Sequence, residues 1–450
     1  MIKDLLSILP QIIVLLTAMA SLIFEMLRKA SGSLITLIIG LAGASGLAIS
    51  RLGTVGTAFS KTFRIDDLSL WAVIILCGTG ILSALLMRQE LKGTNREGTL
   101  YSLVAFSTLG SLLLAGSGDL MFLVLGVLIN SLGGFAMAAY PKTDKATEGA
   151  IKYFVYGSVT GAVMLFGLTY WVGITGTTFI KDLTGITSQA FVLLIGFGGL
   201  ITGLGYAASL FPFHFWTPDT FEGAPVSVAA FLSVTPKIGA FFALAQVMKD
   251  LPPLLDWNLI LGILAVLSMT FGNIVALWQK NMLRLMAYST VAQAGYFLLG
   301  IVAINQSGLA LSGLIIFSLA YAAMNIGAFA VIQRTGNNII YFEGLARKRP
   351  FMAVAMLVFL LSLVGIPPLA GFAGKFLLFG SAMDAGYTWL AVAAILNSVI
   401  SLAVYLRIIF PMFYRKEPIY SFPTSGIITS VFTVCFIVTV LVGILLRFLV

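Results

Sequence analysis

The stretch AAFLSVTPKIGAFF, residues 229–242, places one lysine in the middle of an apolar run. About a dozen apolar or small residues stand on either side of Lys237, so the run is long enough to cross roughly 30 Å of bilayer hydrocarbon as a helix. Pro236 lacks a backbone donor and leaves a carbonyl one turn earlier without its helical partner. We therefore expect a membrane helix with a buried ammonium group, and a freed carbonyl that can bind either this charge or ordered water.

The composition of the whole chain is that of a membrane protein. Of its 450 residues, 59% are hydrophobic and 10% are charged, and the mean hydropathy is +1.05. Soluble domains carry about 25% charged residues, and a soluble chain of this length would divide into domains with charged surfaces. The net charge of +9 lies in short clusters between apolar runs, without a basic stripe of interleaved aromatic residues. The sequence therefore predicts contact with lipid and no nucleic-acid partner.

Few side chains in the sequence could hold a redox centre. The two cysteines, Cys77 and Cys435, stand apart in apolar runs, and His214 is the single histidine. An iron–sulfur cluster needs a fuller set of cysteine or histidine ligands, and a bis-histidine haem needs a second histidine. We therefore expect no metal and no cofactor to be bound by this chain, so that redox cofactors and quinone would belong to partner subunits.

Apolar runs of about 20 residues predict about fourteen membrane helices. The first run is interpreted as a helix and not as a removable signal, because no small-residue cleavage site follows it. No linker is long or polar enough to mark a second domain, so residues 1–450 are expected to form a single transmembrane domain. The expected spans are residues 4–27, 33–50, 68–88, 99–116, 118–140, 150–172, 188–213, 225–248, 256–279, 284–304, 308–333, 351–377, 386–412 and 424–449.

Lysine and arginine are unevenly distributed among the predicted loops. Loops after odd-numbered spans carry most of them, for example Arg28, Lys142 and Arg347, although the segment 51–64 runs against this bias. Loops rich in lysine and arginine usually face the cytoplasm. The sequence therefore predicts a multi-pass protein of the cell inner membrane with both termini outside, and a thylakoid membrane is the alternative location.

A second lysine follows a predicted break in a membrane helix. The stretch GIPPLAGFAGKF, residues 365–376, puts Pro367 and Pro368 in an apolar run shortly before Lys375. Broken helices in membranes line a protein-buried or wet cavity, so Lys375 is expected to face one. Lys152, in the run EGAIKYF of residues 148–154, stands nearer the end of its helix. Extension of Lys152 toward the membrane surface is therefore an equal alternative to a buried role.

Buried lysines are chemically suited to proton transfer. A charged side chain at mid-membrane costs about 2.5–3.5 kcal/mol on insertion scales. Removal from water disfavours the ammonium form, so that a proton can be gained or lost with little free-energy difference and a moving charge nearby can decide the outcome. Proton carrier is therefore the preferred hypothesis for Lys237 and Lys375, and a structural, partnered lysine is the alternative.

A longer run resembles a known family signature. The sequence LFPFHFWTPDTFEGAP, residues 210–225, followed by FLS at 231–233 and by Lys237, resembles the antiporter-like membrane subunits of the NADH–quinone oxidoreductase (complex I) family, and its subunit N branch in particular. The resemblance covers about residues 100–380, whereas the ends agree only in hydropathy. Further runs similar to these subunits are NIVALWQ (273–279), RLMAYS (284–289), AGY (294–296) and the GIPP and GFAGKF parts of 365–376.

The resemblance implies a fold and its divisions. It implies an all-α polytopic membrane protein of about fourteen transmembrane helices, with two inverted five-helix repeats and two broken helices. The breaks are expected near Pro212 and near Pro367 and Pro368. The implied divisions are N-terminal helices at 1–98, a first repeat at about 99–248, a second repeat at about 256–412 and a C-terminal helix at 424–449.

The resemblance also implies residue roles. In such subunits a central line of lysines, glutamate and waters carries protons, with Lys237 at the central position, Lys375 on the exit side and Lys152 near the start of the sixth span. His214 matches the signature histidine, for which packing beside the break is an equal alternative to proton transfer. The other members of the signature loop are Pro212, Trp216, Asp219, Glu222 and Pro225. Helix capping and loop structure explain the two acids of this loop equally well.

Two positions depart from the family pattern. Members generally carry a glutamate in the fifth span and a lysine just before the signature, and this ion pair is thought to gate the lysine line. The matching positions here are Leu128, in GVLINSL (126–132), and Ala207, in GYAASL (205–210). Joint loss is physically reasonable, because loss of one partner would strand the other as a buried charge. It argues against full pumping by the first half-channel, whereas the second, around Lys237 and Lys375, is complete.

Three functions follow, in order of preference. The first is a proton-translocating subunit of a complex I-type oxidoreductase, driven by quinone reduction in other membrane-arm and peripheral subunits, with NADH, ferredoxin or reduced F420 as electron donor. The chain would then be part of an enzyme without having a redox centre of its own. The second is a non-pumping structural subunit of the same complex, and the third is an Mrp-type cation/proton antiporter subunit.

Overall fold

The structure is a computed structural model that describes residues 2–94, 97–414 and 425–445. Helices dominate these residues, and their only strands form one small hairpin. The elements are, in chain order, α1 (Ile2–Ser7), α2 (Leu9–Met26), α3 (Ala30–Ile49), β1 (Gly56–Ala58), β2 (Phe63–Ile65), α4 (Asp67–Leu91), α5 (Glu97–Ala115), α6 (Leu120–Ala138), α7 (Asp144–Thr175), η1 (Ile180–Gly185), α8 (Ala190–Ala208), α9 (Trp216–Gly223), α10 (Val226–Met248), α11 (Trp257–Ala276), α12 (Met282–Val302), α13 (Leu309–Thr335), η2 (Ile339–Phe342), α14 (Leu345–Lys348), α15 (Pro350–Val364), α16 (Ala370–Asp384), α17 (Thr388–Tyr414) and α18 (Gly426–Leu445).

The membrane spans agree with the sequence prediction. Thirteen of the described helices are long and apolar enough to cross a membrane. The remaining predicted span, 351–377, is present as two shorter helices, α15 and α16, on either side of a break. The predicted fold class, an all-α membrane protein, is therefore confirmed. Residues 1, 95–96, 424 and 446–449, which the predicted divisions include, lie outside the described residues.

The first predicted break separates α8 from α9. α8 ends at Ala208, and an irregular segment that contains Pro212 leads to Trp216, where α9 begins. Proline has no backbone N–H and cannot extend the helical hydrogen-bond ladder, which explains why the helix does not continue through this segment. As a consequence α9 is a short element of 8 residues, separated from α10 by the extended backbone of Ala224 and by Pro225.

The second predicted break separates α15 from α16. α15 ends at Val364, and Gly365 adopts a left-handed conformation with φ 98°. Glycine accepts this conformation readily because it has no Cβ. Pro367 and Pro368 follow before α16 begins at Ala370, so the last carbonyls of α15 have no helical N–H partners.

Pro236 does not break its helix, since α10 runs through it from Val226 to Met248. On the turn before the proline, the carbonyl of Ser233 accepts a hydrogen bond of 2.9 Å from the Tyr321 hydroxyl on α13. The carbonyl that Pro236 leaves without a helical donor is that of Leu232, four residues earlier, so the Tyr321 hydroxyl binds the carbonyl next to the freed one.

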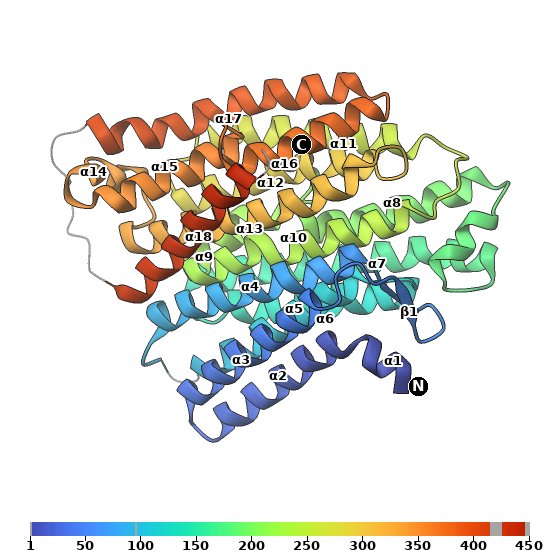
Figure 1. Ribbon diagram of the computed structural model, residues 1–450, viewed down its shortest axis with the longest axis horizontal. Helices are drawn as coiled ribbons and strands as arrows, with labels where there is room; N and C mark the ends of the chain where they lie inside the picture. Colours follow the sequence, from blue (N-terminus) through green and yellow to red (C-terminus); the bar gives the residue numbers. More distant parts are fainter. Residues whose placement is uncertain (1, 95–96, 415–424, 446–450) are drawn as a thin grey trace.

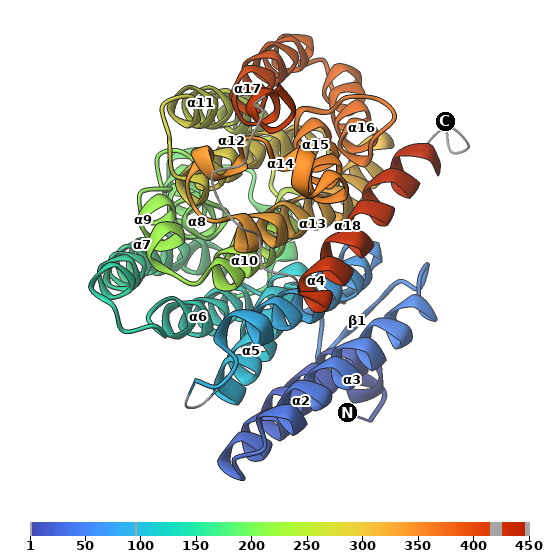
Figure 2. The same ribbon diagram turned by 90° about the vertical axis from the view of Figure 1, so that its left-hand side faces the viewer.

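The helix that carries Lys237 lies in the middle of the bundle. Every residue of α10 is buried, and α12 and α13 beside it are also mostly buried. Figure 2, a view along the helices, shows α10 and α13 inside the bundle, α7 and α17 at its outer edge, and α2 and α3 together at one side. Lys237 is therefore shielded from lipid by protein on all sides.

The two ends of the bundle differ. Figure 1 shows the β1–β2 hairpin at one end, with the N-terminus, and α9 toward the other. At the first end, which we call the hairpin end, Arg64 forms an ion pair with Asp250, and Lys249 lies 3.1 Å from Asp66. At the second end, which we call the α9 end, α9 lies between the first turns of α7 and α12.

Candidate functional site

The side chain of Lys237 is 1% exposed, and among the described residues its Nζ has no hydrogen-bond partner. Its nearest charge-stabilising neighbours are aromatic rings. Nζ lies 4.3 Å from the centre of the Trp216 ring and 5.9 Å from that of Phe221, both on α9. The face of an aromatic ring attracts a cation, by about 2 kcal/mol or more where water is excluded. α9 therefore provides the environment that stabilises a protonated Lys237.

Lys375 is equally buried but is fully partnered. Its Nζ donates to the carbonyls of Leu363 and Val364, at 2.8 and 3.0 Å, and lies 3.6 Å from the centre of the Tyr296 ring. These carbonyls belong to the last turn of α15, where a helix end carries a partial negative charge. The break in the helix therefore creates a binding position for the ammonium group.

Polar side chains occupy the region between the two lysines. Gln293 on α12 donates to the carbonyl of Leu363 at 3.0 Å, so it shares an acceptor with Lys375. The Tyr321 hydroxyl reaches α10 one turn before Lys237. Three buried oxygens, in Thr235, Gln293 and Asn325, have no partner among the described residues. Buried polar atoms of this kind usually bind ordered water, so the interior between α10, α12 and α13 offers hydrogen-bonding positions for water.

His214 lies in the irregular segment between α8 and α9 and is surrounded by aromatic rings. Its ring centre is 4.8 Å from that of Phe271, 4.9 Å from Phe215 and 5.7 Å from Phe211. Its Nδ1 is buried and has no hydrogen-bond partner among the described residues. Neither Lys237 nor Lys375 forms a hydrogen bond with His214 within those residues. The packing role beside the break is therefore supported by geometry, and proton transfer by His214 stays a prediction.

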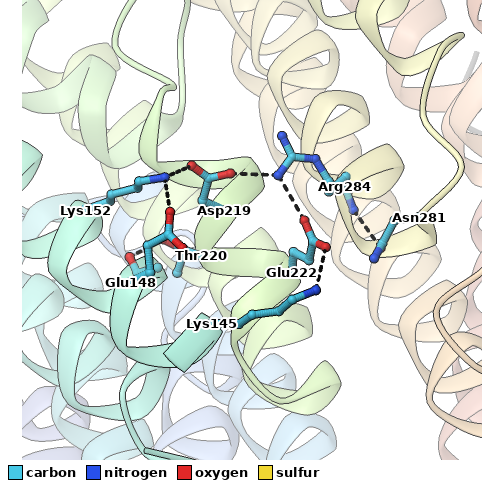
Figure 3. A network of polar contacts seen from close by, with 9 residues as sticks. Lys145, Glu148, Lys152, Asp219, Thr220, Glu222, Asn281 and Arg284 are labelled. Atoms are coloured by element: carbon cyan, nitrogen blue, oxygen red, sulfur yellow. Dashed lines mark hydrogen bonds and ion pairs between the residues drawn. The ribbon is translucent and has the colours of Figure 1, made fainter. Parts of the chain in front are cut away.

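Lys152 lies in an ion-pair network at the α9 end (Figure 3). Its Nζ lies 2.6 Å from an Asp219 carboxylate oxygen and 2.7 Å from one of Glu148, and its side chain is 37% exposed. The other Asp219 oxygen accepts from Arg284 at 2.7 Å, and Arg284 also reaches Glu222 at 3.0 Å. The network therefore ties α9 to α7 on one side and to α12 on the other.

Asp219, which belongs to none of the membrane-spanning helices, is ionised in this network. Partial burial opposes its charge, but hydrogen bonds from Lys152 and Arg284 outweigh this effect and hold the pKa of its carboxyl below the usual range. Opposite charges within hydrogen-bond distance favour the charged form of an acid. Helix capping, which the sequence suggested for Asp219, is therefore not its main role, because its carboxylate oxygens bind side chains of two other helices.

Glu90, at the end of α4, is a functional contact that sequence reasoning missed. Its carboxylate accepts from the backbone N–H groups of Val226 and Ser227, at 2.9 and 2.8 Å, and from the Ser227 hydroxyl at 2.6 Å. These are first-turn N–H groups of α10, which have no helical acceptors because the helix begins after Pro225. An acid at a helix N-terminus stabilises it, so Glu90 fixes the start of the Lys237 helix.

Among the residues that the structure describes, no ion pair replaces the one that the family pattern places at Leu128 and Ala207. Leu128 is 49% exposed on the outer face of α6, and Ala207 is buried in α8. Two residues on, Asn130 faces inward, where it donates to the Ser107 carbonyl at 3.1 Å and to the Ser111 hydroxyl. The described residues thus hold a neutral polar cluster in this region. No group of three or more His, Cys, Asp or Glu side chains that could hold a metal ion occurs within the described ranges.

Comparisons with known proteins cover most of the chain. The family described as NADH:quinone oxidoreductase/Mrp antiporter, TM, matches residues 117–401. NADH-quinone oxidoreductase subunit N of Trichlorobacter lovleyi is 37% identical over 91% of this chain and 87% of its own length. F(420)H(2) dehydrogenase subunit N of Methanosarcina mazei is 38% identical over 80% of this chain and 76% of its own length.

Solved structures share the fold. One chain of respiratory complex I from Thermus thermophilus with bound aureothin superposes with a TM-score of 0.86 at 30% identity, covering 97% of each chain. A chain of the Mrp complex from Dietzia sp. gives a TM-score of 0.87 at 19% identity, covering 99% of this chain and 95% of that one. At that lower identity the similarity shows the fold alone.

Proposed function

Because the chain belongs to the family of NADH:quinone oxidoreductase/Mrp antiporter transmembrane subunits, we propose that it is a proton-translocating membrane-arm subunit of a complex I-type oxidoreductase. The observation that carries this proposal is the burial of two lysines, Lys237 and Lys375, inside a membrane bundle. A charge at such depth is costly and marks a pathway for ions or protons. Quinone reduction in partner subunits supplies the free energy.

The geometry supports a stepwise role for the two lysines. Among the described residues, aromatic rings alone hold a protonated Lys237, so it releases its proton readily when those contacts weaken. The polar groups around Tyr321 and Gln293, with the water that such groups bind, offer the route onward. Lys375 receives the proton at the carbonyls of α15. His214 and Lys152 are assigned supporting roles beside α9, because His214 matches the histidine of the signature and Lys152 matches a family lysine near the start of the sixth span.

Partner subunits hold the redox cofactors and the quinone in this proposal. The matched relatives are named for NADH and for F(420)H(2) as donors, which supports a donor-binding subunit separate from this chain. The distribution of lysine and arginine supports a cell inner membrane, with the α9 end toward the cytoplasm and both termini outside.

One observation favours a second candidate, a non-pumping structural subunit of the same complex. Leu128 and Ala207 stand where the family carries its gating ion pair, and the described residues contain no charged pair at these positions. A subunit without a working gate would still complete the membrane arm. Proton counting with lysine variants distinguishes the two candidates.

The proposed function is tested by replacing Lys375 with methionine. We expect fewer protons taken up per electron by sealed vesicles that contain the whole assembled complex, because the carbonyls of Leu363 and Val364 lose their ionisable partner. Electron transfer with an uncoupler should persist. Uptake is followed with a pH-sensitive acridine dye, with NADH or F420H2 as donor, whichever supports quinone reduction. An unchanged ratio in an assembled complex would favour the structural candidate.

A further inference from the structure

The contacts of Lys237 depend on one short helix. Both rings near its ammonium group, those of Trp216 and Phe221, belong to α9. Within the described residues no carboxylate, carbonyl or hydroxyl accepts a hydrogen bond from Nζ. Any movement of α9 relative to α10 therefore changes the stabilisation of the charged lysine directly.

α9 is bounded at both ends by non-helical backbone. An irregular segment precedes it, and an extended residue and Pro225 follow it. Trp216 is the side chain that fixes its inner face, since the indole N–H donates to the Tyr206 carbonyl at 3.0 Å and the ring stacks on Tyr153 at 3.9 Å. The same indole ring thus contacts the end of α8, the side of α7 and the ammonium of Lys237.

The outer face of α9 is held by charges from two different helices. Asp219 accepts from Lys152 of α7 with one oxygen and from Arg284 of α12 with the other, at 2.6 and 2.7 Å. Figure 3 shows the carboxylate between the two cations. Asp219 of α9 is therefore drawn toward two helices by opposed ion pairs, which change strength when either cation is drawn elsewhere.

One of these ion pairs is accessible from outside the chain. Lys152 is 37% exposed, and its neighbours on α7, Ile151 and Val155, are exposed on the same surface of the bundle. A charge on an adjoining subunit could therefore reach Lys152 and compete with Asp219. Arg284, by contrast, is held by two acids of α9 and anchors it to α12.

From these contacts we infer that Lys152, Asp219 and Arg284 form a charge switch that controls the protonation of Lys237 through the position of α9. They are positioning residues, because none of them touches the ammonium group. When Lys152 leaves Asp219, the pull of Arg284 shifts α9 and its rings away from Lys237, which then releases its proton. The switch takes the place of the ion pair that is missing at Leu128 and Ala207. This inference rests on the proposed function.

The chain contains a matched control for Lys152. Lys145 lies on the same helix, seven residues earlier, and is also ion-paired with an acid of α9, since its Nζ lies 3.4 Å from Glu222. Its side chain is 76% exposed, and within the described residues its ion-pair partner is Glu222 and not Asp219. Lys145 therefore shares the helix, the charge and the partner helix of Lys152 but does not bind the Asp219 carboxylate that the switch releases.

The test measures protons taken up per electron by sealed vesicles that contain the whole assembled complex. We expect Lys152→Met and Asp219→Asn to lower this ratio as far as Lys237→Met does, and the double variants with Lys237→Met to lower it no further. Lys152→Arg should restore the ratio, and Lys145→Met should leave it unchanged. Non-additivity is the signature of residues that act on one step, and a merely structural role would not produce it.

The outcomes distinguish a failure of the switch from a failure of the proposed function. A reduced ratio in Lys237→Met together with a normal ratio in assembled Lys152→Met and Asp219→Asn overturns the switch and leaves the proposed function intact. An equal loss in Lys145→Met overturns it as well, because the effect would then follow from surface charge. A normal ratio in Lys237→Met removes the proposed function itself. Should Asp219→Asn fail to assemble, the comparison of Lys152→Met with Lys152→Arg decides the question.

Discussion

The Lys237→Met variant is expected to lose all proton translocation through this subunit while the complex still assembles and reduces quinone in the presence of an uncoupler. Methionine matches the length of the lysine stem and fits among the apolar neighbours of α10, so the packing is kept. The ammonium group, which has only aromatic contacts among the described residues, is the part that is removed. Protons taken up per electron by sealed vesicles give the measurement.

Two further variants make this prediction specific to protonation. Lys237→Arg keeps a positive charge but cannot release its proton, so we expect it to stop translocation as methionine does. Lys249→Met removes another lysine just after the same helix, one that pairs with Asp66 at the hairpin end, and should pump normally. Normal pumping by Lys237→Arg would show that the charge alone matters and would contradict a carrier role.

The Gly371→Ala variant is expected to prevent stable assembly of the subunit. A Cβ at this position would lie 1.7 Å from the carbonyl oxygen of Ser362 and 2.6 Å from its carbonyl carbon. Both are backbone atoms of α15, which cannot move aside as a flexible side chain can. The two halves of the broken helix must therefore separate, at an expected cost of more than about 4 kcal/mol. The measurement is the amount of assembled complex in membranes and its survival on heating.

Gly380 on the same helix supplies the control for this prediction. A Cβ there would meet only the tip of Leu309, at 3.2 Å. Alanine is favoured over glycine inside a helix by roughly 0.5–1 kcal/mol, so Gly380→Ala should assemble at least as well as the wild type. If Gly371→Ala assembles like Gly380→Ala, the backbones of α15 and α16 can separate at little cost and the prediction is wrong.

The helices and both breaks could be predicted from sequence because each depends on local properties. Hydropathy locates the spans, and prolines near 212 and 367 locate the interruptions. Span ends were harder to predict from composition. The sixth span is expected at 150–172, whereas α7 runs from Asp144 to Thr175. The first turn of α7 carries charged residues, which a hydropathy prediction assigns to the preceding loop. Thr143 caps this turn, so the helix begins before the apolar run.

The ion pairs of the site could not be predicted, because they join residues far apart in the chain. Asp219 meets Lys152 and Arg284 only after α7, α9 and α12 have packed together. A hydropathy argument treats each charge singly, so Lys152 was a candidate for a buried carrier or for extension to the surface. The structure instead places it beside two acids. Glu90 at the start of α10 is a similar case.

The shared carboxylate of Asp219 has a consequence for how far the molecule can be divided. The family resemblance implies two related halves, which invites the idea of a minimal transporter made from one of them. Asp219 belongs to the predicted first half but receives Arg284 from the second, with Glu222 as a further partner. A half expressed alone would expose an unpaired carboxylate pair or an unpaired guanidinium where the other half should be. The two predicted halves are therefore not independent modules, and split or truncated forms should function only when both pieces are supplied together.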